Sequence, residues 1–496
     1  MKAIFRGLSV SMFALAAAGC TTPNPTPLNR PGDVPQGFTA PVADKQAPIW
    51  PEANWWVNFK ADELPSLIDT AQKENLDLAA AAARVLEAEA QDGVAFANLL
   101  PVVNLQGSAQ RNGSHRTTSS FATGPGGTIV QTPGPTVETT TNSFNAGLAA
   151  SYSADFWGLN RDRLYQAREN LRSARYAETV VGLTVQSSVA QQYFTVLATR
   201  ERIVIARQNI DAANRILTVV QAKVTNGVSS NLDLAQEQAV VATQQARLPG
   251  LIEQEREARY ALAILLGRAP EGFDVKAQNL DGIASPTLQA GMPSELLLRN
   301  PSIAEAEANL FASHANVDAA RAAFFPQISL TGSAGYASSD IGNLINPSSF
   351  AWSIGASLLQ SIFDGGRLKA QDDLALAQQQ EQIANYRKTV FTAFSNVESA
   401  LGSVSANNEQ LVALTEEVRA SAEAFRISEL QYREGTIDIL SLLTAQQQLF
   451  TAEDTLVQTK LARLESNVSL YMSLGGGWNQ QQSDKDYKYQ LDWWPL

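Results

Sequence analysis

The chain has 496 residues, 17% of them charged, and its formal net charge is −12 at pH 7. An acidic chain lacks the clustered lysine and arginine of a nucleic-acid surface, so we expect no nucleic-acid partner. One cysteine and two histidines, His115 and His314, leave little for zinc clusters, disulfide frameworks or cysteine–histidine nucleophiles. The sequence contains no nucleophile elbow, phosphate loop or metal-ligand spacing. We therefore expect no catalytic residue, no metal and no cofactor, and a hydrolase is the least favoured class.

The N-terminus has the pattern of a secretory signal peptide at 1–19. Lys2 and Arg6 precede the apolar run Leu8 to Ala18, which is shorter than the roughly 20 residues of a membrane-spanning helix. The run ends in Ala17-Ala18-Gly19-Cys20, which resembles a lipobox. We expect Cys20 to be the acylated first residue of the mature chain. The alternative is ordinary cleavage after Ala-x-Ala, which leaves a free thiol.

The residues after Cys20 indicate a tether. Thr21 follows the cysteine in place of aspartate, which favours sorting to the outer membrane. Pro23 to Pro51 is rich in Pro, Asn, Thr and Gly and has no apolar period. Residues 20–60 are therefore expected to form a lipid-anchored, extended arm.

An internal duplication follows the arm. An alanine-rich helix is expected from about 65 to 98, and at an offset of 225 its Asn75 matches Asn300. The helix ends in Leu99-Leu100-Pro101, which matches Phe324-Phe325-Pro326 at the same offset. After each proline the apolar period changes to 2, which predicts two-faced strands of the length that crosses a membrane. The expected strands are 102–111 and 143–155 in the first copy, and 327–336 and 350–361 in the second.

A soluble hairpin with one face on a core is the alternative for these strands. Export of the chain and the aromatic residues beside the strands favour the membrane, because such residues form interfacial girdles. The polar stretches Asn112–Asn142 and Ala337–Ser348 are expected to be external loops. Four strands cannot close a barrel, and an open edge in lipid leaves unpaired backbone groups, so other chains must complete the sheet.

The longest pattern is a heptad repeat. Every seventh residue from Leu376 to Tyr432 is apolar or aromatic, which predicts a coiled-coil helix roughly 85 Å long. At an offset of 208 the same heptad seam recurs from Val189 to Val224. Helical hairpins are therefore expected at 160–267 and 367–475.

Each hairpin turns at a glycine, Gly227 or Gly435, which supplies a left-handed helix end. Pro249 stands where the second hairpin has Val457, and a proline there is expected to kink the returning helix. The predicted layout is two structural repeats flanked and joined by shorter segments: 61–267, a connecting belt segment 268–292, 293–475, and a C-terminal tail 476–496.

These features together resemble the TolC-like outer-membrane efflux channel family, in its lipoprotein branch associated with resistance-nodulation-division pumps. The motifs that carry the resemblance, in order and duplicated, are Cys20, Trp55-Trp56, the strands that follow proline, Phe156-Trp157-Gly158, Phe363-Asp364-Gly365-Gly366-Arg367 and Tyr432-Arg433-Glu434-Gly435-Thr436. The resemblance implies a mainly α fold with a membrane β-barrel. Three copies would form a 12-stranded β-barrel continued by a 12-helix periplasmic α-barrel, with the belt segment and tail around its middle.

The resemblance also implies partners and a function. The homotrimer would sit in outer-membrane lipid, extend into the periplasm, and meet a periplasmic adaptor (membrane fusion) protein and an inner-membrane pump of the resistance-nodulation-division type. It would be a passive exit duct of a tripartite efflux system. The alternatives are a coiled-coil envelope scaffold, which needs no lipid-facing strands, and a type I protein secretion channel of the same fold.

The candidate gate lies at the hairpin tips. Tyr432 and Asp233 fall on positions that resemble the family's closing latch, in which a tyrosine hydroxyl bonds an aspartate of the neighbouring hairpin. The family's latch arginine corresponds to Ile437, and its acidic ring positions fall on Ser441 and Thr444, while Asp438 stands nearby. The alternative is that Tyr432 only ends the heptad seam and that Asp233 completes a capping box with Ser230.

Overall fold

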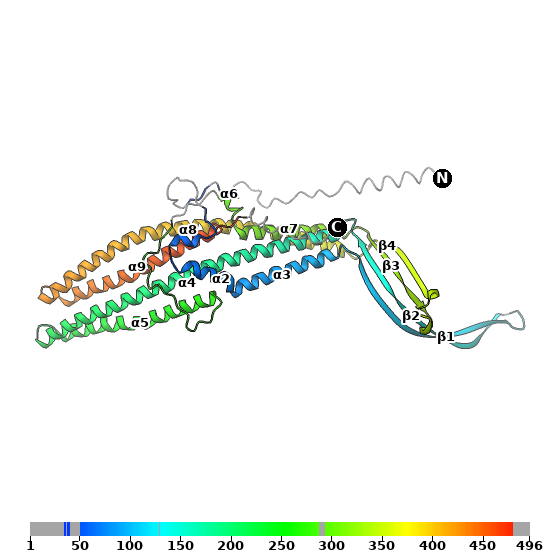
Figure 1. Ribbon diagram of the computed structural model, residues 1–496, viewed down its shortest axis with the longest axis horizontal. Coiled ribbons are helices and arrows are strands. Elements are labelled where there is room, and N and C mark those ends of the chain that lie inside the picture. The colour runs from blue at the N-terminus through cyan, green and yellow to red at the C-terminus, as the bar shows by residue number, and fades with distance from the viewer. Residues whose placement is uncertain (1–33, 36, 40–49, 128, 287–292, 480–496) are drawn as a thin grey trace.

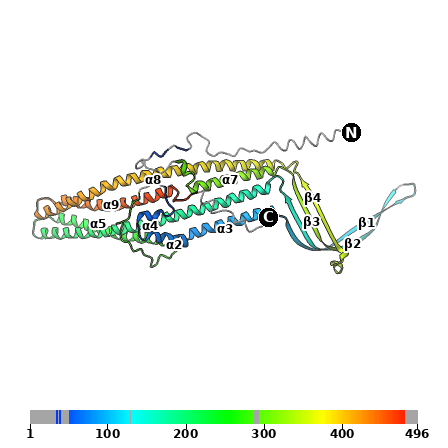
Figure 2. The same cartoon turned by 45° about the horizontal axis from the view of Figure 1, so that its top comes forward.

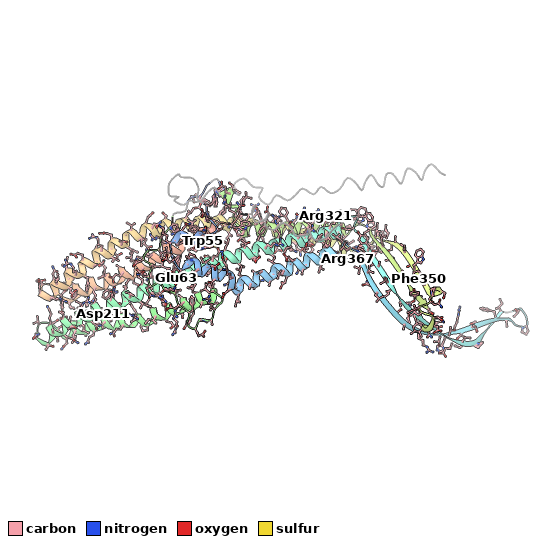
Figure 3. All side chains as sticks on the ribbon, viewed as in Figure 1. Trp55, Glu63, Asp211, Arg321, Phe350 and Arg367 are labelled. Atoms are coloured by element: carbon pink, nitrogen blue, oxygen red, sulfur yellow. The ribbon has the colours of Figure 1, made fainter. Side chains whose placement is uncertain are left out.

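The computed structural model describes residues 34, 35, 37–39, 50–127, 129–286 and 293–479. The signal peptide, Cys20, most of the predicted arm and most of the tail lie outside these residues. The described chain is elongated, with long helical hairpins at one end and a four-stranded sheet at the other (Figures 1 and 2). Figure 3 places Phe350 on the sheet, Trp55 and Glu63 at the middle, and Asp211 toward the hairpin tips.

The elements follow the predicted duplication. A 3₁₀ turn, η1, precedes the first copy, and η2 and η3 lie between the last two strands. The elements in chain order are η1 (Trp55–Phe59), α2 (Leu64–Glu74), α3 (Leu76–Ala97), β1 (Val102–Thr123), β2 (Ile129–Ala154), α4 (Leu159–Thr225), α5 (Asn231–Leu265), α6 (Pro293–Leu296), α7 (Pro301–Ala322), β3 (Gln327–Ser338), η2 (Ile341–Asn343), η3 (Pro347–Ser349), β4 (Phe350–Leu359), α8 (Arg367–Glu434) and α9 (Ile439–Ser473).

The single helix predicted at 65–98 is wrong, because the chain breaks at Asn75. Asn75 is extended (φ −67°, ψ 131°), and its side chain accepts a bond from the Leu78 amide at 2.9 Å. Its Nδ2 also donates to the carbonyl of Leu265 at 2.8 Å, so the break docks the end of α5 against the start of α3. A cap of this kind satisfies a backbone donor that a continuous helix would hold internally.

Two glycines allow these helix ends to meet. Gly267 has φ +67°, and a Cβ there would lie 2.1 Å from the Glu74 carbonyl oxygen. Gly475, its counterpart at an offset of 208, has φ +89°, and a Cβ would lie 1.8 Å from the Arg299 carbonyl oxygen. Only glycine fits both the left-handed backbone and the close approach. Each returning helix is thus continued by a helix of the upper half, α5 by α3 and α9 by α7.

The long helices have the predicted seams. α8 has 68 residues, about 100 Å of helix, and every heptad position from Leu376 to Tyr432 is buried or half-buried. α5 is assigned as one helix through Pro249, so the proline does not end it. The described chain has three apolar clusters: one at the middle, around Trp55, Phe194 and Tyr471, a smaller one near the tips, around Ile216, Phe425 and Phe450, and a small one around Tyr176 between α4 and α7.

The belt segment is fixed to the middle by polar contacts. The partly buried guanidinium of Arg200 on α4 donates to the carbonyls of Val275 and Ala277 at 2.7 and 2.8 Å, and it pairs with Glu255 of α5 at 2.9 Å. The Glu63 carboxylate accepts the amides of Lys276 and Ala277 at 3.0 Å. Charge-assisted bonds of this kind hold a segment that has little regular structure of its own.

The strands form one antiparallel sheet in the order β1-β2-β3-β4. The stretch Asn112–Asn142, predicted to be an external loop, instead continues β1 and β2 as a long hairpin that pairs as far as Thr123 with Ile129. Its Ser/Thr/Gly/Pro composition is typical of a loop. Backbone pairing between strands does not require apolar side chains, however, and threonine is enriched in strands. The connection between β3 and β4 is short and contains η2 and η3, although the predicted loop Ala337–Ser348 begins inside β3; its external position stays a prediction.

Candidate duct wall and tip gate

The sheet has one apolar and one polar face because the registers of all three strand pairs keep residues of the same kind together. Leu105 pairs with Leu148, Leu148 with Ala334, and Ala334 with Trp352. One step along, Gln106 pairs with Gly147 and Ser333 with Ser353. A slip of one residue in any pair would mix the two faces, so the alternation in sequence and the observed register agree.

The apolar face is open in the single chain. Leu105 is 82% exposed, Ile354 83% and Trp352 69%. A contiguous apolar face of this kind marks contact with lipid or protein. Among the described residues, no helix combines the length and the apolarity needed to cross a membrane.

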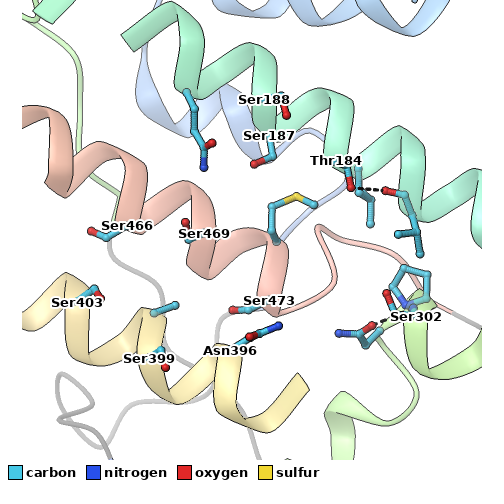
Figure 4. Close-up of a pocket in the computed structure, with 17 residues that line it drawn as sticks. Thr184, Ser187, Ser188, Ser302, Asn396, Ser399, Ser403, Ser466, Ser469 and Ser473 are labelled. Carbon is cyan, nitrogen blue, oxygen red and sulfur yellow. Dashed lines mark hydrogen bonds between the residues drawn. The ribbon is translucent and has the colours of Figure 1, made fainter. Parts of the chain in front are cut away.

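At the mid-height of the helices a polar groove of about 600 Å³ lies where α9 ends and α7 begins, between α4 and α8 (Figure 4). Serine, threonine, asparagine and glutamine side chains dominate its lining, and no ionisable residue takes part. Ser187 is 9% exposed and its oxygen points into the groove, while Ser399 and Ser403 line the α8 side. Hydroxyl and amide groups therefore line the groove beside a few apolar side chains, and no charged group takes part.

The turns at the two tips have the same backbone conformation and hydrogen bonds. Gly227 and Gly435 are left-handed, with φ +73° and +81°. Beyond each glycine an amide bonds back to the last helical turn, Val228 to the Lys223 carbonyl at 2.8 Å and Thr436 to the Gln431 carbonyl at 2.9 Å. This is the Schellman arrangement, which satisfies carbonyls that a helix end leaves free. The predicted turn glycines therefore have the predicted conformation.

Asp233 is a helix cap in this structure. Its Oδ2 accepts the Ser230 amide at 3.0 Å, while the Ser230 hydroxyl accepts the Asp233 amide at 3.1 Å, which completes a capping box. The Ser229 hydroxyl also donates to Oδ2, at 2.5 Å. This bond and the Ser230 amide lower the pKa of Asp233. The carboxylate is therefore engaged at the start of its own helix.

Tyr432 contacts the first hairpin at Lys223 and Ser229, and not at Asp233 as the sequence predicted. The direct bond to Asp233 expected from the family latch is absent from the described contacts, because Ser229 stands between them, 3.5 Å from the Tyr432 hydroxyl. Lys223 donates to the Tyr432 carbonyl and lies 4.5 Å from the centre of its ring. Burial raises the pKa of Tyr432. Sequence reasoning missed Lys223 and Ser229 as contacts, since neither heptad spacing nor capping patterns report which hairpins touch.

The hydrogen bonds of the other candidate gate residues stay within the second hairpin. Asp438 caps α9 and accepts the Ser441 amide at 2.9 Å; this side chain is exposed, and its bonds from Ser441 lower its pKa. Thr444 is exposed, and its hydroxyl donates to the Leu440 carbonyl one turn back at 2.8 Å. In the described chain no hydrogen bond or ion pair joins Asp438, Ser441 or Thr444 to the first hairpin, although the carboxylate of Asp233 is close enough to repel that of Asp438.

A buried carboxyl lies one turn beyond Asp233. Glu237 is 0% exposed, and neither of its carboxylate oxygens has a hydrogen-bond partner of normal geometry in the described chain. Burial raises its pKa to about 7, and the nearby amide of Gln446, itself fully buried, offsets only part of that rise. Glu237 lies one heptad before the buried Gln244, but two polar residues at this spacing give no sign of burial in the sequence. The tip core thus contains a carboxyl that ionises near neutral pH.

A chain with a two-faced sheet at one end and coiled-coil helices of about 100 Å at the other has the architecture of an outer-membrane channel that extends into the periplasm. Comparison with known proteins agrees. The chain belongs to the outer membrane efflux protein family, whose model matches residues 67–268 and 292–476.

Individual relatives match over nearly their whole length. The pyoverdine export outer membrane protein OpmQ of Pseudomonas aeruginosa is 39% identical over 432 residues, 87% of this chain and 88% of that protein. The cation efflux system protein CusC of Escherichia coli is 32% identical over 471 residues, 94% of this chain and 98% of that protein. The solved outer-membrane channel OprN superposes with a TM-score of 0.80 at 27% identity, covering 91% of this chain and all of OprN. The TolC-like fold predicted from the sequence is confirmed.

Proposed function

We propose that three copies of the chain form a passive exit duct that joins an inner-membrane pump to the cell exterior. The observation that carries this proposal is the sheet register, which gathers the large apolar side chains, with few exceptions, on one face and leaves β1 and β4 as open edges. In lipid both edges must pair with another chain. β1 and β4 run in opposite directions, so β4 of one copy can pair with β1 of the next as one further antiparallel step around a ring.

A barrel with an open passage needs more than two copies, and the family resemblance implies three. Two copies would give eight strands, an interior that side chains fill, whereas three give twelve and leave room for a passage. The helices support the same ring. In the lower half the helices lie in the row α5-α4-α9-α8, and in the upper half in the row α3-α4-α7-α8.

Apolar side chains are left exposed on the outermost helices of both rows. Leu86 and Val94 of α3 are 65% and 67% exposed, and Val412 and Leu374 of α8 are 74% and 58% exposed. A head-to-tail contact between the α3/α5 edge of one copy and the α8 edge of the next would cover them and close into a ring.

The partners follow from the family. OpmQ and CusC are by name an export and an efflux protein, so this chain is proposed to work with a periplasmic adaptor at its tips and a resistance-nodulation-division pump beyond it. The tips are the free ends of the hairpins and serve as the gate, with Tyr432 and Asp233 in the closing contacts through Ser229 and Lys223. Cys20 is proposed to carry acyl chains as an auxiliary anchor in the outer membrane.

The assembly is tested by purification in mild detergent and by recording in planar bilayers. A mass of three chains and stepwise single-channel currents are expected. A monomer in mild detergent, or a chain soluble without detergent, would contradict the proposal.

The anchor is tested separately by mass spectrometry of the mature N-terminus. Acylated Cys20 is expected, and Cys20→Ser is expected to lose the lipid and keep the channel, because an inserted barrel does not depend on one or two acyl chains at about 0.8 kcal/mol per buried CH₂. An unmodified cysteine would refute the anchor alone.

A further inference from the structure

The polar face of the sheet carries no ionisable side chain over the whole four-stranded part. Its members are asparagine, glutamine, serine, threonine and glycine, with alanine and a few apolar residues: Val102, Asn104, Gln106, Ser108, Gln110, Ser143, Asn145, Gly147, Ala149, Ser151, Ser153, Gln327, Ser329, Thr331, Ser333, Gly335, Ala337, Ala351, Ser353, Gly355, Ser357 and Leu359. In a chain that is 17% charged, a whole face without charge is a property of that face and not of the composition.

The polar groups of this face bond to one another across strands. The Ser333 and Ser353 hydroxyls are 2.8 Å apart, and Asn145 Nδ2 donates to the Ser108 hydroxyl at 3.3 Å. Hydroxyls and amides that are already paired, or that bond to water, have little net affinity for a passing solute, because a new hydrogen bond replaces an old one. The face can therefore be hydrated, but it does not bind a passing solute tightly.

The nearest charges lie at the ends of the strands. Arg111 pairs with Asn142 at the outer end and continues the side of the apolar positions Leu105 and Ala109. At the inner end Asp155 follows β2, and its carboxylate, 9% exposed, accepts the amides of Asn160 and Arg161 at 3.2 and 2.9 Å. Arg111 is thus turned aside and Asp155 is engaged. Arg163 of α4 lines a pocket with Ser153 and Gln327 at the inner end, so the uncharged part of the face begins beyond that pocket. Charges farther along the chain are screened beyond about 8 Å at physiological salt.

We propose that the outer-membrane span of the duct is neutral and that it passes hydrophilic cargo of either charge sign with equal ease. The proposal rests on the proposed function, since it takes the polar face to line the passage. The cargo class is water-soluble molecules rich in hydrogen-bonding groups, whether cationic, anionic or uncharged. Any preference for one charge sign then arises elsewhere than in the span. The uncharged groove at mid-height in Figure 4 has the same chemistry.

A cysteine introduced at one position can measure this directly, because Cys20 is the only native cysteine. In full-length Cys20→Ser protein reconstituted in vesicles, Ser353→Cys reports the polar face and Ile354→Cys the apolar face. Each variant is treated with two methanethiosulfonate reagents, one carrying trimethylammonium and one carrying sulfonate. Their rates are divided by the rates with a free small thiol, and mass spectrometry follows the reaction.

Reaction at Ser353→Cys with a normalised cation-to-anion ratio within about twofold of one is expected, with Ile354→Cys protected by lipid. Adding Ser333→Asp beside Ser353→Cys is expected to raise the ratio at least about tenfold. The effect of that carboxylate on thiol ionisation cancels in the ratio.

Two results overturn parts of the account separately. A ratio far from one at Ser353→Cys without Ser333→Asp refutes the neutral span and leaves the duct standing. Equal reaction at Ser353→Cys and Ile354→Cys means that neither face is in lipid, which refutes the proposed function itself.

Discussion

The two hairpin tips are stabilised by equivalent caps and turns, but the residues through which they contact each other are not equivalent between the two repeats. At an offset of 208, Ser230 corresponds to Asp438 and Asp233 to Ser441, so the serine and the aspartate of the cap have exchanged places. The left-handed glycines correspond as well. Duplication has thus preserved what each tip needs to fold.

The residues that join the tips have no such counterpart. Lys223 corresponds to Gln431, Tyr432 to Val224, and Glu237 to Ala445. The capping positions serve each hairpin alone, whereas these positions serve the pair. The comparison teaches that folding of a tip and closure of the tips are separable, and mutations can test each.

The largest difference between the tips is Glu237. Its pKa in the folded tip, about 7, is above the ordinary value of 4.5, so the folded tip binds more protons than the unfolded one between these values. Stability of the tip therefore falls as pH rises from about 4.5 to 7 and is lowest above pH 7, by about 3 kcal/mol in all. Hydrogen exchange of residues 231–241, corrected for intrinsic rates, is expected to show less protection at pH 8 than at pH 5.

Glu237→Gln is expected to abolish this pH dependence, because the amide is never charged. Glu434→Gln, which removes an exposed carboxylate from the other tip, is the matched control and should retain it. If the protection in Glu237→Gln still varies with pH as in the parent chain, the buried carboxyl is not the source.

The caps are expected to contribute equally to the two tips. Ser230→Ala and Asp438→Ala each remove a side-chain acceptor from one helix start, and each should cost about 1 kcal/mol of local stability. Hydrogen exchange in the first turns of α5 and α9 measures both in one experiment. A loss confined to one tip would break the equivalence drawn from the duplication.

The smallest effect on stability is expected from the Tyr432 hydroxyl. At 3.5 Å from Ser229 its bond is long, so Tyr432→Phe should cost no more than about 0.5 kcal/mol. Lys223→Met removes the cation from the same ring and carbonyl and should have the larger effect on closure. Single-channel conductance is expected to rise in Lys223→Met, in Asp233→Ala and weakly in Tyr432→Phe, with the trimer retained. Unchanged conductance in all three would leave these residues as structural contacts only.

Periodicity predicted the fold because each part of it has one dominant repeat. The heptad seam from Leu376 to Tyr432 and the alternation around Ser333 and Ser353 are read directly as a helix and a two-faced strand. The break at Asn75 could not be read, because a cap inside good helix formers depends on what the freed groups meet, here the carbonyl of Leu265. The extension of β1 and β2 past Asn112 was hidden by a composition that loops share.

The tip contacts were not predictable for a different reason. Lys223, Ser229 and Tyr432 lie on two hairpins, and their meeting depends on how the hairpins pack. A motif position alone assigned Asp233 to Tyr432, but the short bond from Ser229 to Asp233 takes the place that a direct latch would need. Glu237 could not be singled out either, because it lies outside the heptad register that contains Pro249, and its burial is a property of the packed hairpins.

The central claim is that β1 and β4 of neighbouring copies pair to close one barrel. In the Cys20→Ser background, single cysteines on the polar face of β1, at Gln106 or Ser108, are combined with Ser353→Cys on β4 and oxidised in the membrane. Within one chain these strands are separated by β2 and β3, about 14 Å, which is beyond the reach of a disulfide. Covalent trimers that resist boiling in detergent and collapse to monomers on reduction are predicted for at least one pair. Monomers only, in every pair, would contradict the barrel.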